Sequence, residues 1–129
     1  MDRPLATKMI QSLHHAQITI PRHAEAEARI FYCHILGLPE IEKPDSLKKR
    51  GGFWLKVGEI TIHIGLEDEV ERTHTKAHLA YQVSDLDLWR SRLAKIGITA
   101  ENGIPIPGYN RFEFRDPFGN RVEFIQSID

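Results

Sequence analysis

The chain has 129 residues, of which 41% are hydrophobic, and a formal net charge of -1. This length fits one compact domain or two closely packed half-domains, and the apolar content is enough for an ordinary core, which argues against a disordered chain. The near-neutral charge gives no electrostatic reason to expect nucleic acid or an anionic membrane as a partner. The single cysteine, Cys33, excludes an intrachain disulfide.

The N-terminal stretch argues against a secretory signal. Residues 1–11 include charged side chains and a proline, and they lack a continuous apolar segment. Elsewhere no run approaches the roughly 18 apolar residues that a membrane span requires. We therefore expect a soluble, cytoplasmic protein.

The first half of the chain predicts one strand, one helix and three further strands. Residues 12–21 alternate polar and apolar side chains, as a half-buried strand does. Residues 23–36 are rich in Ala and Glu and carry apolar side chains at helical spacing, and Gly37 ends this predicted helix. The three following strands are predicted at residues 38–43, 52–57 and 59–67.

The second half repeats this order after a polar stretch at residues 68–76, which predicts a solvated linker. Residues 78–83 alternate like a strand, and Ser84 and Asp85 are suitable caps for a helix that ends near Ile96. The closing strands are predicted at residues 98–102, 109–115 and 121–126. The chain is therefore predicted to be one domain, 1–129, that contains a βαβββ module twice, at residues 12–67 and 77–127.

Four side chains of metal-ligand type occupy equivalent positions in the two predicted modules. His15 lies 63 residues before His78, and His63 lies 60 residues before Glu123, so an insertion of three residues reconciles the two offsets. A pseudo-twofold axis between the modules would bring both pairs toward one point. We therefore predict that His15, His78 and Glu123 bind a divalent metal ion, with His63 as a fourth ligand.

Each of these residues also has a purely structural interpretation. His15 and His78 lie on polar strand faces, where a histidine can simply hydrogen-bond at a strand end. Glu123 lies between two apolar residues, and a salt bridge with Arg121 or Arg115 is the alternative to a metal ion. For His63, a ligand role and a buried histidine that bonds to backbone both fit the pattern, and Glu67 is an alternative ligand on the same strand face.

Several segments carry a family resemblance. They are HAQITI from His15, FYCHILGL from Phe31, HLAYQVSDLD from His78 and RDPFGNRVEF from Arg115. Together they resemble the vicinal oxygen chelate superfamily, which contains glyoxalase I, fosfomycin-resistance thiol transferases, bleomycin-binding proteins and extradiol dioxygenases. The resemblance covers residues 13–126, and the Asp-Pro-x-Gly-Asn-x-x-Glu pattern is its most specific part. It implies an α+β fold in which the two βαβββ modules form a curved mixed-sheet barrel.

The resemblance also implies a ligand set. In this superfamily the first strand of each module carries a histidine ligand and the last strand carries a glutamate, which match His15, His78 and Glu123. The fourth ligand comes from the last strand of the first module, which is His63 here, where bacterial glyoxalase I usually has a glutamate. The resemblance further implies a homodimer in which each site takes one module from each copy. The donor types suit Zn, Ni, Mn and Fe(II).

We expect a divalent-metal-dependent lyase or isomerase of glyoxalase type that acts on a small oxygen-chelating substrate, with Glu123 as ligand and general base. The alternatives are an Fe(II) extradiol-type dioxygenase, a fosfomycin-type thiol transferase and a non-catalytic drug-binding protein of the bleomycin-resistance type. Candidate substrate contacts are Trp54, Tyr109, Arg111 and Arg115. For these residues, core packing or solvated strand charges are the alternative interpretation.

Overall fold

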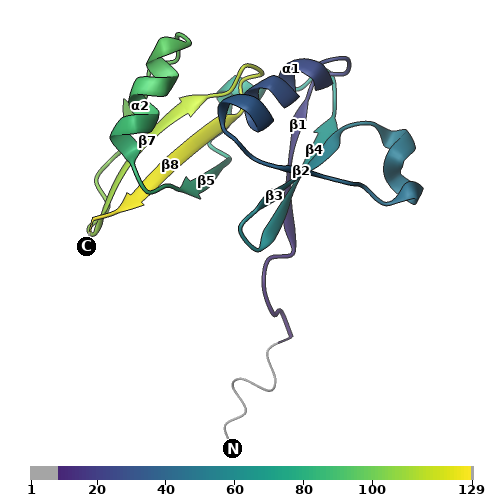
Figure 1. Ribbon diagram of the computed structural model, residues 1–129, viewed down its shortest axis with the longest axis horizontal. Coiled ribbons are helices and arrows are strands. Elements are labelled where there is room, and N and C mark those ends of the chain that lie inside the picture. The colour runs from purple at the N-terminus through teal and green to yellow at the C-terminus, as the bar shows by residue number, and fades with distance from the viewer. Residues whose placement is uncertain (1–8, 129) are drawn as a thin grey trace, which may run out of the picture. The chain divides into compact units, whose positions relative to one another are not determined.

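The computed structural model describes residues 9–128 and is drawn as a ribbon in Figure 1. The chain divides into two compact units, one ending at Leu66 and the other beginning at Glu67. The expectation about a secretory signal concerns residues 1–11, most of which lie outside the described residues. Within residues 9–128, no helix is both long enough and apolar enough to cross a membrane.

The first unit is a four-stranded mixed sheet with one helix, formed by α1 and η1, and a separate short 3-10 helix. Its elements are β1 His15–Ile20, α1 Glu25–Arg29, the π-helix η1 Ile30–Ile35, β2 Glu40–Ile41, the 3-10 helix η2 Asp45–Arg50, β3 Phe53–Val57 and β4 Ile60–Leu66. The strand order is β1-β4-β3-β2, with β1 parallel to β4 and the other neighbours antiparallel. The sequence does not predict η2, because its six residues contain one apolar side chain and therefore no periodic pattern.

The second unit repeats this topology. Its elements are the 3-10 helix η3 Arg72–His74, β5 His78–Gln82, α2 Leu86–Lys95, β6 Glu101–Asn102, β7 Tyr109–Arg115 and β8 Arg121–Ser127. The strand order is β5-β8-β7-β6, again with the first and last strands parallel. The predicted α+β fold with two βαβββ modules is confirmed. Within each unit the four-stranded sheet stays open, so no barrel closes inside a unit.

Strand alternation gives each sheet one apolar face and one polar face. The apolar face of the first unit and its helical segment supply the buried side chains Ile20, Ala28, Phe31, Tyr32, Phe53, Leu55, Ile62 and Ile64. The second unit buries Tyr81, Leu86, Leu93, Phe112, Phe114, Val122 and Phe124 in the same way. The candidate ligands belong to the opposite strand parity, so the apolar cores leave both polar faces available for chemistry.

The polar composition of the segment between the two modules predicts a solvated linker, but the structure buries part of it. Arg72 in η3 is 7% exposed and donates a hydrogen bond to the carbonyl oxygen of Glu67. From β7, Arg115 donates to the carbonyl oxygens of Arg72, at 3.1 Å, and Thr75, at 3.4 Å. The prediction of a solvated linker is therefore wrong for Arg72. Guanidinium groups donate to backbone carbonyl oxygens of this segment and tie it to the second sheet, and such bonds cannot be read from composition.

The turn between β7 and β8 is organised by Asp116, whose side chain is buried. Its Oδ1 accepts hydrogen bonds from the backbone N–H groups of Phe118, at 2.9 Å, and Asn120, at 2.8 Å. Its Oδ2 accepts a third from Asn120 Nδ2 at 2.9 Å. This carboxylate therefore satisfies donors that the turn itself leaves without a strand partner, and it sets the start of β8.

We expect Asp116→Ala to lower the free energy of unfolding by about 2–4 kcal/mol. The substitution removes three hydrogen bonds and leaves two backbone N–H groups without an acceptor. Urea denaturation of the full chain measures this loss. Asp116→Asn is the matched control, since its amide oxygen can still accept from both backbone donors, and it should lose less than half as much. A change within about 0.5 kcal/mol for Asp116→Ala would contradict the role given to this carboxylate.

Candidate metal centre

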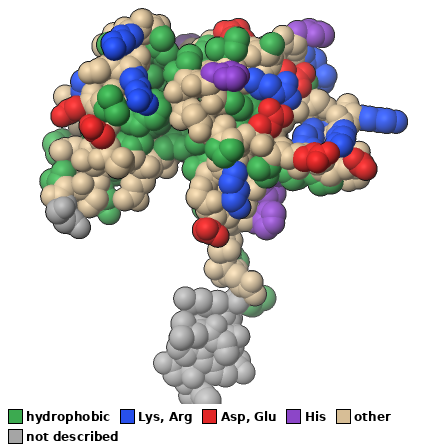
Figure 2. All heavy atoms as spheres, viewed as in Figure 1, with side chains coloured by type: hydrophobic (Ala, Val, Ile, Leu, Met, Phe, Trp, Pro, Cys, Tyr) green, Lys and Arg blue, Asp and Glu red, His purple; other side chains and the backbone are tan. Residues whose placement is uncertain are grey.

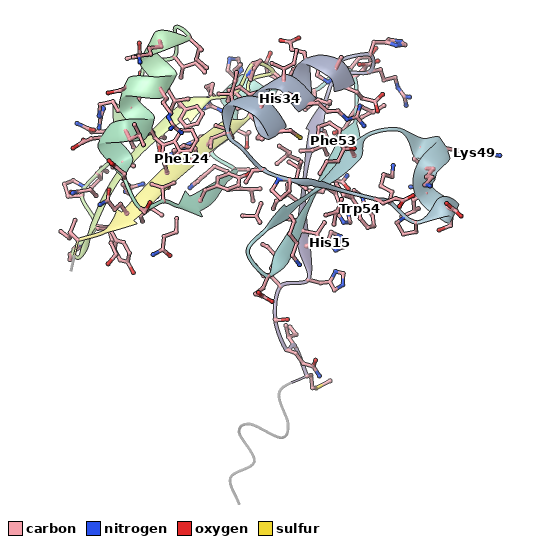
Figure 3. The ribbon with its side chains drawn as sticks, in the orientation of Figure 1. His15, His34, Lys49, Phe53, Trp54 and Phe124 are labelled. Atoms are coloured by element: carbon pink, nitrogen blue, oxygen red, sulfur yellow. The ribbon has the colours of Figure 1, made fainter. Side chains whose placement is uncertain are left out.

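In the first unit the candidate ligands His15 and His63 lie on the parallel neighbours β1 and β4. His63 is opposite Gln17 in the register, two residues after His15. The two imidazole rings stack with their centroids 4.0 Å apart and 13° between their planes. Trp54 on β3 is opposite His63 and stacks on it, with centroids 3.9 Å apart and 2° between the planes. The three rings form one stack on the polar face of the sheet. His15 and Trp54, the two outer rings, are labelled in Figure 3.

The environment of His63 favours a neutral imidazole. Burial lowers its pKa below the usual 6.5, and the neighbouring His15, His14 and Lys43 lower it further. A neutral ring nitrogen with its lone pair is the form that binds a metal ion. In addition, Nδ1 of His15 lies 3.0 Å from Nδ1 of His14, and this contact orients the His15 ring.

The lowered pKa of His63 predicts how stability depends on pH. The folded chain disfavours protonation of this ring, so the unfolded chain takes up the proton first as the pH falls below 6.5. The contribution of His63 to stability is therefore present above pH 6.5 and is lost as the pH falls toward the lower pKa of the folded state.

We expect His63→Gln to gain stability relative to the native chain as the pH is lowered from about 7.5 to about 5.5, because the variant has no ring to protonate. Urea denaturation of metal-free protein at several pH values measures the difference between the two chains. His34→Gln, which changes an exposed histidine of η1, is the control and should follow the native profile. Parallel profiles for the native chain and His63→Gln would contradict this interpretation.

In the second unit His78 and Glu123 repeat the placement of the first pair. They lie on the parallel neighbours β5 and β8, and Glu123 is opposite Ala80, two residues after His78. Nε2 of His78 lies 3.0 Å from Oε1 of Glu123. Nδ1 of His78 lies 2.8 Å from the carbonyl oxygen of Lys76, which can only accept, so Nδ1 carries a proton. Nε2 is therefore the ring nitrogen that faces the Glu123 carboxylate.

Glu123 is 4% exposed, and its charge is compensated by Arg111. One terminal nitrogen of Arg111 lies 3.2 Å from Oε1 of Glu123, and the guanidinium also donates to the carbonyl oxygen of Ile104 at 3.0 and 2.8 Å. Gly103 leaves room for this guanidinium, since a Cβ there would lie 2.8 Å from its central carbon. Glu123 thus forms its ion pair with Arg111 and not with Arg121, which pairs with Glu113, or Arg115, which donates to backbone carbonyl oxygens. The expected partners were wrong, and the Arg111 pair holds the carboxylate in one orientation.

The predicted substrate contacts have different surroundings. Trp54 lines a cavity of about 460 Å³ with His63 and lies outside the apolar core. In the second unit, Tyr109 and Arg111 line a separate cavity of about 380 Å³. Arg115 donates to three backbone carbonyl oxygens, and these contacts account for its position without a substrate. Its role as a substrate contact stays a prediction.

The structure brings the four predicted ligands together as two pairs, one in each unit. Across the described range 9–128, no group of three or more His, Cys, Asp or Glu side chains is gathered as a metal site. Sequence reasoning considered Arg111 only as a substrate contact and missed that it compensates Glu123. That role depends on the register, in which Arg111 is opposite Ile125, two residues after Glu123. It also missed the cationic side chains that line a cavity with His63, which come from η2, from Lys43 before it and from Arg22 after β1.

The comparison with protein families gives one clear match. A family model of the Glyoxalase/Bleomycin resistance protein/Dioxygenase superfamily matches residues 12–124, nearly the whole described range. The chain belongs to this superfamily. Within it, the chain is similar to a crystal structure described as a glyoxalase family protein from Bacillus anthracis, with 41% sequence identity and a TM-score of 0.85 over 94% of this chain and 98% of that one. A comparison with curated proteins found no match.

Other solved structures share the superfamily fold at lower identity. A glyoxalase/dioxygenase from Nostoc punctiforme has 22% identity and a TM-score of 0.78, over 100% of this chain and 99% of that one. The fosfomycin resistance protein FosX from Listeria monocytogenes, in complex with Mn(II) and 1S,2S-dihydroxypropylphosphonic acid, has 20% identity and a TM-score of 0.73, over 93% and 95% of the chains. At these identities the likeness concerns the fold alone.

Proposed function

We propose that the chain is a divalent-metal-dependent enzyme of glyoxalase type, a lyase or isomerase that acts on a small oxygen-chelating substrate. In this proposal His15, His63, His78 and Glu123 bind one metal ion, for which Zn, Ni, Mn and Fe(II) are the candidates. The observation that carries it is the matched register. In each unit, the residue two positions after the first-strand histidine is opposite the second ligand-type side chain, which lies on the parallel last strand.

The chemistry of the donor set fits a divalent ion. Three imidazoles and one carboxylate are ligands for all four candidate metals, and the neutral state favoured for His63 is the metal-binding one. Nε2 of His78 and Oε1 of Glu123 lie side by side, as two donor atoms that bind one metal ion would. Mn(II) in FosX, a protein of the same fold, agrees with this choice.

When bound, such an ion acts as a Lewis acid that stabilises negative charge on a substrate oxygen. The chain's own contribution is proton transfer and orientation. Both close contacts of Glu123, with His78 and Arg111, use Oε1. We therefore assign proton removal from a carbon next to a carbonyl group to Oε2. Arg111 is a positioning residue, because its bonds to Ile104 fix the guanidinium that holds Oε1.

The test is a turnover assay of the full chain after removal of metal and reconstitution with each of the four ions. We expect at least one form to isomerise a hemithioacetal, or another substrate with a carbonyl next to a hydroxylated carbon. Solvent deuterium should be taken up at the former carbonyl carbon, which receives the proton while the hydroxylated carbon becomes the new carbonyl. Ring cleavage of a catechol by the Fe(II) form, thiol addition to fosfomycin, or bleomycin binding without turnover would each overturn the proposal in favour of one alternative. A homodimer and a cytoplasmic location stay predictions.

A further inference from the structure

The cavity beside His63 has a strongly cationic wall. Its volume of about 460 Å³ falls in the range of small-molecule sites. Trp54 and His63 line it from the polar face of the sheet, and the surrounding segments contribute the cationic side chains Arg22, Lys43, Lys49 and Arg50. Within the described residues, its wall contains no Asp or Glu. Figure 2 shows Lys and Arg side chains on this unit, and Figure 3 labels Lys49 on η2.

The η2 segment, which carries Lys43, Lys49 and Arg50, is tied to the rest of the first unit. Lys43 Nζ donates to the carbonyl oxygen of Gly51 at 2.6 Å, and the backbone N–H of Gly52 donates to Glu25 Oε2 at 2.9 Å. Gly51 and Gly52 adopt φ values of 73° and 78°, a region that glycine occupies without strain. The first bond joins the two ends of the η2 segment, and the second uses the nearby carboxylate of Glu25 and ties this segment to α1.

The acidic side chains near η2 are also occupied. Lys48 forms ion pairs at 2.9 Å with both Glu42 and Asp45, and Lys48 itself does not line the cavity. The wall adds a neutral donor, because Gly65 leaves room for the carboxamide of Gln17, whose Nε2 would lie 2.9 Å from a Cβ at that position. The cavity therefore presents several N–H donors and an excess of positive charge next to a candidate ligand.

We propose that this cavity binds an anionic group of the substrate, a phosphonate, phosphate or carboxylate. Guanidinium and ammonium groups form strong charge-assisted hydrogen bonds with such oxyanions, and several converging donors favour them over neutral groups. The proposal names the substrate class of the enzyme proposed above and rests on that proposed function. The oxyanion lies beside His63 and the face of Trp54, so its binding is visible in the fluorescence of that tryptophan.

The experiment uses the full chain carrying Trp89→Phe, which leaves Trp54 as the only tryptophan. Metal is removed with a chelator, and phenylphosphonate is titrated while Trp54 fluorescence is recorded. We expect a saturable change, with binding at least about tenfold weaker in Arg50→Gln and in Lys43→Gln, since each loses one charge-assisted bond. Lys56→Gln, which removes the same charge from β3 outside the cavity, should bind within about twofold of the parent.

Three results would overturn the cavity proposal. These are no saturable change up to about 10 mM ligand, an equal loss of affinity in Lys56→Gln, and equal affinity for benzyl alcohol, which carries no charge. The titration needs neither metal nor turnover, so it is repeated with His78→Ala. Binding of phenylphosphonate to His78→Ala supports the cavity proposal even when the enzyme assay fails. Absent binding in a chain that turns over its substrate overturns the cavity proposal alone.

Discussion

Glu123→Gln is expected to lower turnover by at least about 100-fold, because the carboxylate is the proposed general base. The same substitution should also weaken metal binding, since a neutral amide replaces an anionic ligand opposite His78 Nε2. Glutamine has the same shape and its amide oxygen can still accept from Arg111, so the chain should keep its fold. Turnover and metal affinity of the reconstituted full chain, with circular dichroism as the check on folding, measure these effects.

Glu113→Gln is the matched control for this prediction. Glu113 on β7 is directly opposite Glu123 in the register and pairs with Arg121, so the substitution removes the same charge one strand away. Because Glu113 belongs to a different ion pair, we expect metal affinity and turnover within about threefold of the native chain. Native turnover in Glu123→Gln, or an equal loss in Glu113→Gln, would show that the assignment of Glu123 is wrong.

Gly52→Ala is expected to lower the free energy of unfolding by more than about 3 kcal/mol, a large share of the 5–15 kcal/mol of an ordinary domain. The φ value of 78° at this position already disfavours a side chain. In addition, a Cβ at Gly52 would overlap the backbone carbonyl oxygen of Ile64 on β4, which cannot move aside as a flexible side chain does. Urea denaturation of the full chain measures the loss.

Gly58→Ala separates the two causes. Gly58 has a φ value of 57°, but an added Cβ would have no heavy atom within 4 Å. Its cost should therefore be that of the backbone conformation alone, about 1–2 kcal/mol. If both variants lose the same stability, the close approach of Gly52 to β4 does not contribute, and the anchoring of the η2 segment proposed above loses its support.

Most of the fold could be predicted from the sequence, because two local signals are strong in this chain. The alternation of residues 12–21, 109–115 and 121–126 predicts β1, β7 and β8, since the pleat sends every second side chain to the core. The expectation that Asp85 caps the second helix is confirmed by its bond from the backbone N–H of Leu88, at 3.0 Å. The repeat of these signals predicts the βαβββ topology of both units.

Other features depend on contacts that no local pattern encodes. The helix predicted at residues 23–36 winds as a π-helix over Ile30–Ile35, and the polar segment at Arg72 is held by backbone carbonyl oxygens. The bonds of the Arg72 segment join residues that are apart in the sequence, and nothing in the sequence pattern explains the π-helical winding. For Trp54, core packing is the alternative to a substrate contact, yet its strand parity and the neighbouring His63 place it in a ring stack beside a cavity.

The candidate site could be predicted in part. The repeat offsets identify the equivalent positions of His15 and His78 and of His63 and Glu123, and the strand registers place each pair side by side. Arg111 as the partner of Glu123 could not be found in this way, because Arg115 on β7 and Arg121 on β8 are other candidates and only the register selects one. Metal binding by all four residues stays a prediction.

Elemental analysis of the full chain, purified without chelators and then reconstituted, tests the central claim most directly. The native chain is compared with His15→Ala, His63→Ala, His78→Ala and Glu123→Ala, and His34→Ala serves as an exposed control on η1. We predict near-stoichiometric divalent metal in the native chain and the control, and its loss in each ligand variant, including both variants of each unit. A native chain without metal after reconstitution, or ligand variants that retain it, would contradict the proposed metal centre.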